Sequence, residues 1–188
     1  MMKSALAVGF AVLALAFGGL ANAQTASQYK NSDGSSSPSV YAQTPIAAPA
    51  VTPTISTSAY TAGYVLGGVE AFTIPATGIV QAVISDFNTG AYVGGVDWLI
   101  FKVSPAGGGT TDHAALAITA ADMPNLIGVI HATDCKLTAT VTSYCQSGNS
   151  PAAFKVTAGT TLYVVKQVIG TPTFTNATDD TDTLLIIQ

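Results

Sequence analysis

Short runs of β-branched and aromatic residues, separated by turn residues, fill the chain from residue 59 onward. Glycine, proline or asparagine ends most of these runs, and no segment carries the long amphipathic pattern of a helix. Such a series predicts an all-β fold, an antiparallel β-sandwich of about nine short strands with jelly-roll-like connectivity. The expected strands cover residues 59–73, 78–87, 96–103, 113–119, 126–132, 137–144, 161–170 and 184–188, with a turn, or one helical turn capped by Asp122, at 122–125.

Several of these runs are apolar at nearly every position, as in Trp98 to Phe101 and Leu162 to Val165. Continuous apolar sequence is typical of strands that are covered on both faces. A small sandwich buries only the inner faces of its sheets, so something else must cover the outer ones. We therefore expect contact between subunits, which predicts a homo-oligomer.

The N-terminus has the three parts of a secretory signal peptide. Lys3 precedes an apolar run at residues 5–17, and the small-residue sequence Ala-Asn-Ala follows at 21–23. We expect cleavage after residue 23, so that Gln24 begins the mature chain; a retained anchor is the alternative. No later stretch is long enough to span a bilayer, which predicts a soluble product that is secreted, periplasmic or at the cell surface.

Residues 24–58 differ in composition from the rest of the chain. Ser, Asn and Gln give way to Ala, Thr and Pro, with prolines at 38, 45, 49 and 53. Regularly spaced prolines block helix formation and favour extended chain. We interpret this segment as a linker or flexible tail, or as an arm that lies over a neighbouring subunit. The β-sandwich domain is then residues 59–188.

The charge inventory argues against two classes of partner. The chain has ten acidic residues and no arginine, and removal of Lys3 from its six basic residues leaves five lysines. Nucleic-acid binding relies on clustered Lys and Arg to neutralise phosphates. We therefore expect neither nucleic acid nor an anionic membrane as a partner.

Two cysteines, Cys135 and Cys145, would form a disulfide in an oxidising compartment. Ten residues of continuous strand would separate their Cα atoms by roughly 33 Å, whereas a disulfide needs less than about 7 Å. The chain must therefore reverse between them, although residues 137–142 alternate like a strand and contain no turn residue. We favour the bond, which would stabilise the fold by about 3 kcal/mol. The spacing excludes a Cys-x-x-Cys redox pair.

We assign no catalytic, metal-binding or cofactor-binding residue. The chain has two histidines, His113 and His131, that could act as a general base. It has no Gly-x-Ser-x-Gly motif that would supply a serine nucleophile for them to activate. Together with Asp112 and Asp134 they could bind zinc, but adjacent residues of a strand point to opposite faces, which disfavours the set.

The acidic and aromatic residues offer weaker candidates. Residues 176–182 form an oxygen-rich loop that could hold calcium, although a solvated acidic turn is favoured because the loop lacks an EF-hand pattern. Glu70, Asp86 and Asp97 do not form a recognisable glycosidase pair. The tyrosines that could stack on sugars are Tyr60, Tyr64, Tyr92 and Tyr144.

Five segments carry a resemblance to a known class of protein. They are Tyr60 to Gly68, Gly78 to Asp86, Val96 to Pro105, Ala121 to Ile130 and Leu162 to Thr175. In this order they resemble small tailed-phage virion proteins of the head-decoration or fibre type. The resemblance implies a β-sandwich that builds or decorates particles and has no enzymatic activity. The signal peptide departs from that class, because phage heads assemble in the cytoplasm. Either the fold serves a secreted assembly, or an export segment was joined to a phage-derived domain.

The resulting hypothesis is a secreted, non-enzymatic structural protein that self-assembles as a decoration, fibre or surface-layer protein. The alternative is a secreted module that binds carbohydrate or another surface, with the tyrosines and the 176–182 loop as its site.

Overall fold

A computed structural model of the chain describes residues 29–30, 36–37, 46–74, 77–88, 91–147, 152–155 and 161–187. The chain divides into two units, residues 1–43 and 44–188. In the first unit, β1 (Tyr29–Lys30) pairs with β2 (Ser36–Ser37) in antiparallel fashion. The expected signal peptide, residues 1–23, and much of the segment 24–58 lie outside the described residues.

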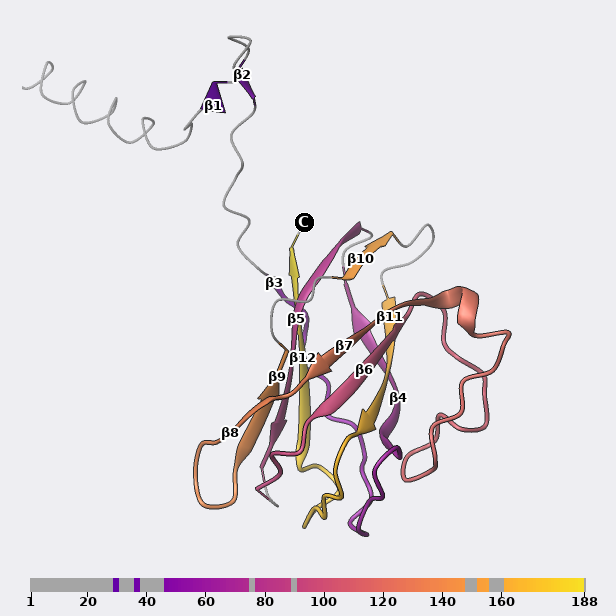
Figure 1. Ribbon diagram of the computed structural model, residues 1–188, viewed down its shortest axis with the longest axis vertical. Helices are drawn as coiled ribbons and strands as arrows, with labels where there is room; N and C mark the ends of the chain where they lie inside the picture. Colours follow the sequence, from indigo (N-terminus) through magenta and orange to yellow (C-terminus); the bar gives the residue numbers. More distant parts are fainter. Residues whose placement is uncertain are drawn as a thin grey trace, which may run out of the picture. The chain divides into compact units, whose positions relative to one another are not determined.

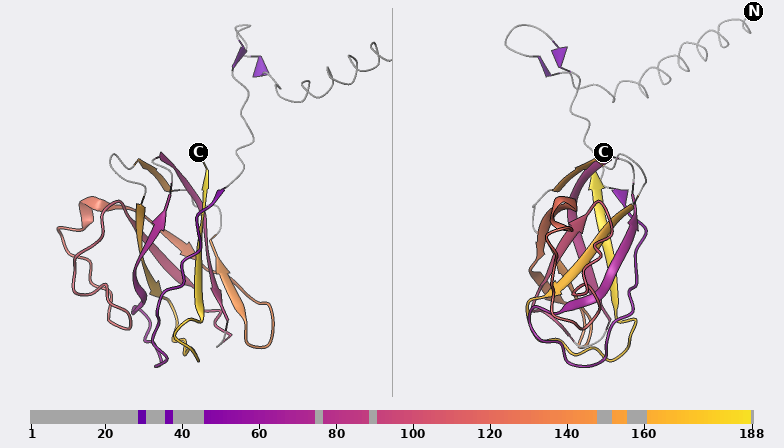
Figure 2. Two further views of the ribbon diagram at one scale, coloured as in Figure 1. Left: turned by 180° about the vertical axis from the view of Figure 1, so that it is seen from behind. Right: turned by 90° about the vertical axis from the view of Figure 1, so that its right-hand side faces the viewer.

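The second unit is an antiparallel β-sandwich of two sheets that face each other (Figures 1 and 2). One sheet has the order β4-β11-β6-β7, and the other has the order β12-β5-β9-β8. The strands are β4 (Val65–Thr73), β5 (Thr77–Phe87), β6 (Val96–Phe101), β7 (Leu126–Ala132), β8 (Asp134–Leu137), β9 (Ser143–Gln146), β11 (Thr161–Val168) and β12 (Asp180–Ile187). Two short strands extend the second sheet: β3 (Ile46–Ala47) pairs with β12, and β10 (Ala152–Lys155) pairs with β5.

This architecture confirms the predicted fold class, with eight strands in the two sheets instead of nine. Most connections cross from one sheet to the other, as in jelly-roll-like sandwiches. Only the β6–β7 and β8–β9 connections of the eight strands stay within a sheet. Consequently, strands that follow each other in sequence, such as β11 and β12, place their side chains against each other across the core.

The interior is filled by aromatic and aliphatic side chains from both sheets. Trp98 and Phe72 have ring centroids 6.0 Å apart, and Phe87 lies 5.5 Å from Phe174. Burial of large apolar side chains contributes roughly 1.5–3 kcal/mol each and is the main source of stability in such a fold. The strand β12 alternates strictly, with every second residue buried.

Part of the outer face of the β4-β11-β6-β7 sheet is covered by the chain itself. Leu116 and Ile118, from the long connection between β6 and β7, pack on a second apolar cluster. That cluster comprises Val65, Leu99, Phe101 and Val165. The connection appears beside this sheet in Figure 1 and ends in a short 3-10 helix, η1 (Met123–Asn125). The continuous apolar runs in β6 and β11 therefore need no second subunit to cover them.

Residues 113–119 were predicted as a strand, and this prediction is wrong. The segment makes only isolated bridges, at Ala115 with Tyr64 and at Ala117 with Gly109. Its apolar residues have the composition of a strand because they cover the outer face of a sheet. Asp122 precedes η1 without capping it, since its carboxylate binds Thr119 Oγ1 and the Ala106 N–H group.

The predicted strand at 137–144 is a hairpin turn flanked by β8 and β9. The Thr138 N–H group donates to the Thr142 carbonyl at 2.9 Å, and the two threonine hydroxyls lie 2.9 Å apart. Cys135 and Cys145 are directly paired across the hairpin and form the disulfide, with Cα atoms 4.0 Å apart. The predicted bond and the predicted chain reversal are thereby confirmed.

Residues 46–58 lie on the sandwich. The Ala48 N–H group donates to the Leu184 carbonyl, and Val51 and Asp182 exchange both backbone hydrogen bonds. Ile55 is buried in the main core. The C-terminal part of the expected linker or arm therefore runs along β12 of its own chain.

Candidate functional site

Four ionisable side chains meet in the centre of the sandwich. Glu70 comes from β4, Lys166 from β11, and Asp180 and Asp182 from β12. Each occupies an inward position of its strand, because side chains alternate between faces and the apolar neighbours on the same side are buried. Glu70 is 3% exposed, and the other three side chains are fully buried. We call these four residues the core cluster.

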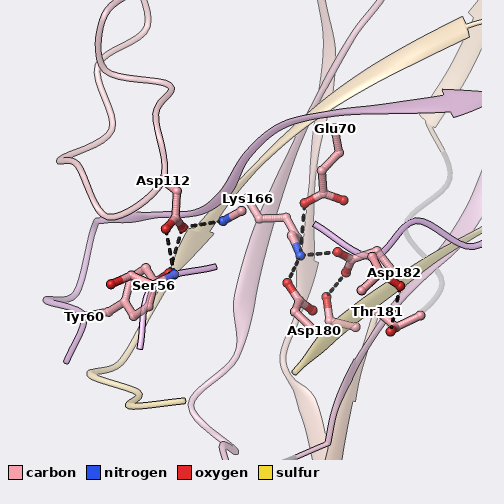
Figure 3. A network of polar contacts seen from close by, with 11 residues as sticks. Ser56, Tyr60, Glu70, Asp112, Lys166, Asp180, Thr181 and Asp182 are labelled. Carbon is pink, nitrogen blue, oxygen red and sulfur yellow. Dashed lines mark hydrogen bonds and ion pairs between the residues drawn. The ribbon is translucent and has the colours of Figure 1, made fainter. Parts of the chain in front are cut away.

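Lys166 is the hub of the core cluster (Figure 3). Its Nζ donates hydrogen bonds to Asp180 Oδ2 and Asp182 Oδ2, and it lies 3.1 Å from Glu70 Oε1. The Ser85 hydroxyl donates to the other oxygen of Asp182 at 2.7 Å. The ring centroid of Trp98 is 5.8 Å from Lys166 Nζ, within the range of a cation–π interaction.

Several carboxyl oxygens of the core cluster accept no hydrogen bond. Glu70 Oε1 is at ion-pair distance from Lys166, but neither Glu70 oxygen has a hydrogen bond of good geometry. Asp180 Oδ1 is also buried without a hydrogen-bond partner. An unpaired carboxylate oxygen in an apolar interior is costly when the group is charged. The arrangement therefore favours neutral carboxyl groups at Glu70 and Asp180.

Electrostatics point the same way. Burial and the nearby charge of Asp182 raise the pKa of Glu70 well above its ordinary value. Burial, and again the charge of Asp182, raise the pKa of Asp180 to about 7. Burial by itself lowers the pKa of Lys166, but the surrounding carboxylates outweigh this and raise it. With protons on Glu70 and Asp180, one ammonium faces one carboxylate and the core cluster is neutral.

The three carboxyl groups also lie within the spacing of a metal site. One oxygen from each of Glu70, Asp180 and Asp182 lies within 4.8 Å of the others. The Lys166 ammonium, however, already occupies the position between them and supplies the positive charge that a metal ion would bring. The geometry is that of an internal lysine–carboxylate cluster.

Sequence reasoning missed the core cluster. Asp180 and Asp182 were assigned to a solvated acidic turn, and this interpretation is wrong because β12 begins at Asp180 and buries both. The signal was the alternation from Asp180 to Ile186, in which two acidic residues take the same face as Leu184 and Ile186. Lys166 interrupts an apolar strand in the same way.

Asp179, the third buried residue of that loop, makes hydrogen bonds within the loop. Its carboxylate accepts hydrogen bonds from the backbone N–H groups of Thr175 and Asn176 at 2.9 and 2.7 Å. The carboxylates of the expected calcium loop therefore bind backbone, hydroxyl and ammonium groups of the protein.

Asp112 and His113 join two segments of the chain. Asp112 accepts hydrogen bonds from the Tyr60 hydroxyl, the Gly67 N–H group and the Ser56 N–H group, at 2.7, 2.7 and 2.8 Å. His113 Nε2 lies 3.0 Å from the Ala59 carbonyl oxygen. Gly67 has φ +79°, and an added Cβ would lie 2.6 Å from Pro53 Cβ, so the position requires glycine.

The four residues considered as a zinc site have separate partners. His131 Nδ1 lies 2.6 Å from Asp97 Oδ1 on the surface, and Asp134 accepts a hydrogen bond from Gln146. Within the described ranges, the only three-residue group of potential ligands is the acidic part of the core cluster. The structure does not bring His113 and His131 together.

The residues considered for sugar binding are also dispersed. Tyr60 and Tyr92 are buried in the core, and Tyr64 and Tyr144 are partly buried. The Tyr92 hydroxyl donates to the Gly95 carbonyl at 2.6 Å. Of the three carboxylates weighed for glycoside hydrolysis, Glu70 is buried, Asp97 pairs with His131, and Asp86 is exposed on β5.

Comparisons with known proteins place the chain in no family. No family model matches it, and neither a curated protein nor a solved structure is similar at a significant level. The resemblance to tailed-phage virion proteins therefore stays a prediction. In the part of the chain that the structure describes, no helix has the length and apolar character needed to cross a bilayer.

Proposed function

We propose that the protein is an exported, non-enzymatic structural β-sandwich that self-associates. The observation that carries this proposal is the sealed position of the core cluster. Lys166, Asp180 and Asp182 have no exposed surface, so no substrate can touch them in the folded state. The groups with the chemistry of an active site thus serve the interior of the molecule.

A patch of exposed apolar side chains supports the self-association. Val93, Val141 and Ile169 are 50%, 51% and 43% exposed. They share one end of the sandwich, because the Ala91 N–H group donates to the Val141 carbonyl and the Ile169 N–H group donates to the Gly95 carbonyl. We call these three residues the end patch. Exposed apolar side chains that gather at one end of a fold favour contact with another protein.

The occupant that the proposal assigns to the end patch is a second copy of the chain. The low charge of the chain limits repulsion between copies. Association through the end patch would bury the three side chains of each copy.

The test is the mass of the mature protein in solution, measured by light scattering on the wild type and on Val141→Asp. A charge within an apolar contact should convert an oligomer into monomers. Val103→Asp is the matched control, because Val103 is also 51% exposed but follows the opposite end of β6. A monomeric wild type at high concentration would contradict self-association, and equal effects of both variants would contradict the assigned patch.

A further inference from the structure

We propose that Lys166 and Asp182 condense into an intramolecular amide bond that covalently joins the two sheets of the sandwich. β11 and β12 belong to opposite sheets, so the bond would cross the core. The inference does not depend on self-association, since it concerns the inside of one chain.

The reacting groups are already in contact. Lys166 Nζ donates to Asp182 Oδ2, and both side chains are fully buried. Two groups that are held together in this way react as if at very high concentration, and the dry interior excludes competing water. A folded chain would thus provide the positioning that the same groups lack in solution.

Asp182 is the better acceptor of the two aspartates. The Ser85 hydroxyl donates to its Oδ1 at 2.7 Å and would stabilise the negative charge that develops on this oxygen during attack. Asp180 Oδ1 has no donor, so the same charge there would be buried without stabilisation. Asp180 therefore stays a neutral carboxyl group beside Lys166 while Asp182 reacts.

Glu70 is placed to move the protons. Its Oε1 lies 3.1 Å from Lys166 Nζ, and one of its oxygens lies within 4.8 Å of an Asp182 oxygen. Its raised pKa keeps a proton on the carboxyl group for donation. A carboxyl that can give a proton and then take one back is a general acid–base catalyst.

The step balances without a further reagent. The Lys166 ammonium passes a proton to the Asp182 carboxylate, and the resulting neutral amine attacks the Asp182 carboxyl carbon. A C–N bond forms, and the C–O bond to one carboxyl oxygen breaks, its electron pair leaving with the oxygen. Glu70 protonates the departing hydroxyl and accepts one of the two amine protons, and the other stays on the nitrogen as the amide N–H. One water leaves, and nothing is oxidised or reduced.

The product suits the core better than the reactants do. Burial of an ammonium and a carboxylate carries a large desolvation penalty, even when they are paired. A neutral amide in the same place removes both charges. Expulsion of the water from an apolar interior would further favour the condensed state.

The first measurement is the intact mass of the purified mature chain after denaturation and reduction. The expected value is lower than the sequence mass by one water. Trypsin provides a second readout, since Lys155 and Lys166 are the last two lysines of the chain and the latter becomes resistant when acylated. The expected product is the peptide 156–188, uncut and one water lighter. A chain with the full sequence mass that is cut after Lys166 would overturn the proposal.

Fragmentation of that peptide identifies the acceptor. A ring from Lys166 to Asp182 suppresses all fragments from backbone breaks within residues 166–182, so fragments should come only from breaks before Lys166 and beyond Asp182. Fragments from breaks between Asp180 and Asp182 would place the bond on Asp180 and overturn the assignment to Asp182.

Two matched variants remove one acid each from the same cluster. Glu70→Gln should fold and retain the full sequence mass, because it lacks the group that moves the protons. Asp180→Asn should still lose one water.

Ser85→Ala should slow the loss of water about a hundredfold, as expected for removal of one donor to a developing oxyanion. Water loss at an unchanged rate in Glu70→Gln would overturn the role of Glu70, with circular dichroism verifying the fold of each variant.

Discussion

Asp112 illustrates how one partly buried residue can organise several segments. Its carboxylate accepts hydrogen bonds from Ser56, Tyr60 and Gly67, which lie on the segment before β4 and on β4 itself. Burial, followed by the hydrogen bond and the charge of Asp112, raises the pKa of Tyr60. The tyrosine therefore stays a neutral donor to this carboxylate at physiological pH.

Replacement of Asp112 by alanine should lower the free energy of unfolding by about 2–3 kcal/mol, because it leaves donors at Ser56, Tyr60 and Gly67 without their acceptor. The measurement is chemical denaturation followed by tryptophan fluorescence. Asp134→Ala is the control, since Asp134 is exposed and its loss should cost less than about 1 kcal/mol. Equal losses in the two variants would contradict the role of Asp112.

The core cluster predicts a pH dependence that shows most clearly in Glu70→Gln, where no amide bond is expected. Asp180 binds its proton up to about pH 7 in the folded chain, whereas its ordinary pKa is 3.8. The folded state therefore holds more protons between about pH 4 and 7. The free energy of unfolding should fall as pH rises through this window, by at most about 1.4 kcal/mol per pH unit.

Denaturation of Glu70→Gln at several pH values tests this sign. The double variant Glu70→Gln, Asp180→Asn is the control, because it lacks the titrating carboxyl and should show a flatter profile. A free energy of unfolding that rises from pH 4 to 7 in Glu70→Gln would show that Asp180 is ionised in the folded chain.

At the scale of elements, the β8–β9 hairpin shows where local pattern and tertiary structure disagree. Residues 137–142 alternate like a strand, yet Thr138 and Thr142 close a turn through backbone and hydroxyl hydrogen bonds. Threonine has a high strand propensity and none of the conformational freedom of glycine. The cross-strand disulfide fixes this reversal, and the need for reversal was visible from the cysteine spacing alone.

Reduction of the disulfide, or the double substitution Cys135→Ser, Cys145→Ser, should lower the free energy of unfolding by about 3 kcal/mol. The expectation follows from the loop-closure entropy of a ring of about ten residues. Thermal unfolding of the oxidised and reduced wild type measures the effect, with the serine variant unchanged by reductant as the control. A reductant-insensitive wild type would contradict a contribution of the bond to stability.

At the scale of the whole molecule, composition and strand spacing were sufficient to predict the antiparallel sandwich, because alternation and turn residues act locally. The β6–β7 connection was not predictable in the same way, since Leu116 and Ile118 have strand-like composition but cover a sheet. The core cluster depends on pairings between distant strands: Glu70 and Lys166 are nearly a hundred residues apart and meet only after β4 pairs with β11. No local pattern contains that information.

The pairing of β3 with β12 determines how the sandwich would respond to a pulling force. Ile46 lies opposite Ile186, so the chain enters and leaves the described sandwich at the same end. Tension between these two points would peel β12 away from its neighbours one residue pair after another. A strand resists this kind of force poorly, because its hydrogen bonds break one at a time instead of all together. With Lys166 joined to Asp182, peeling from Ile187 would stop at Asp182, and the load would pass through a covalent link to β11 in the opposite sheet.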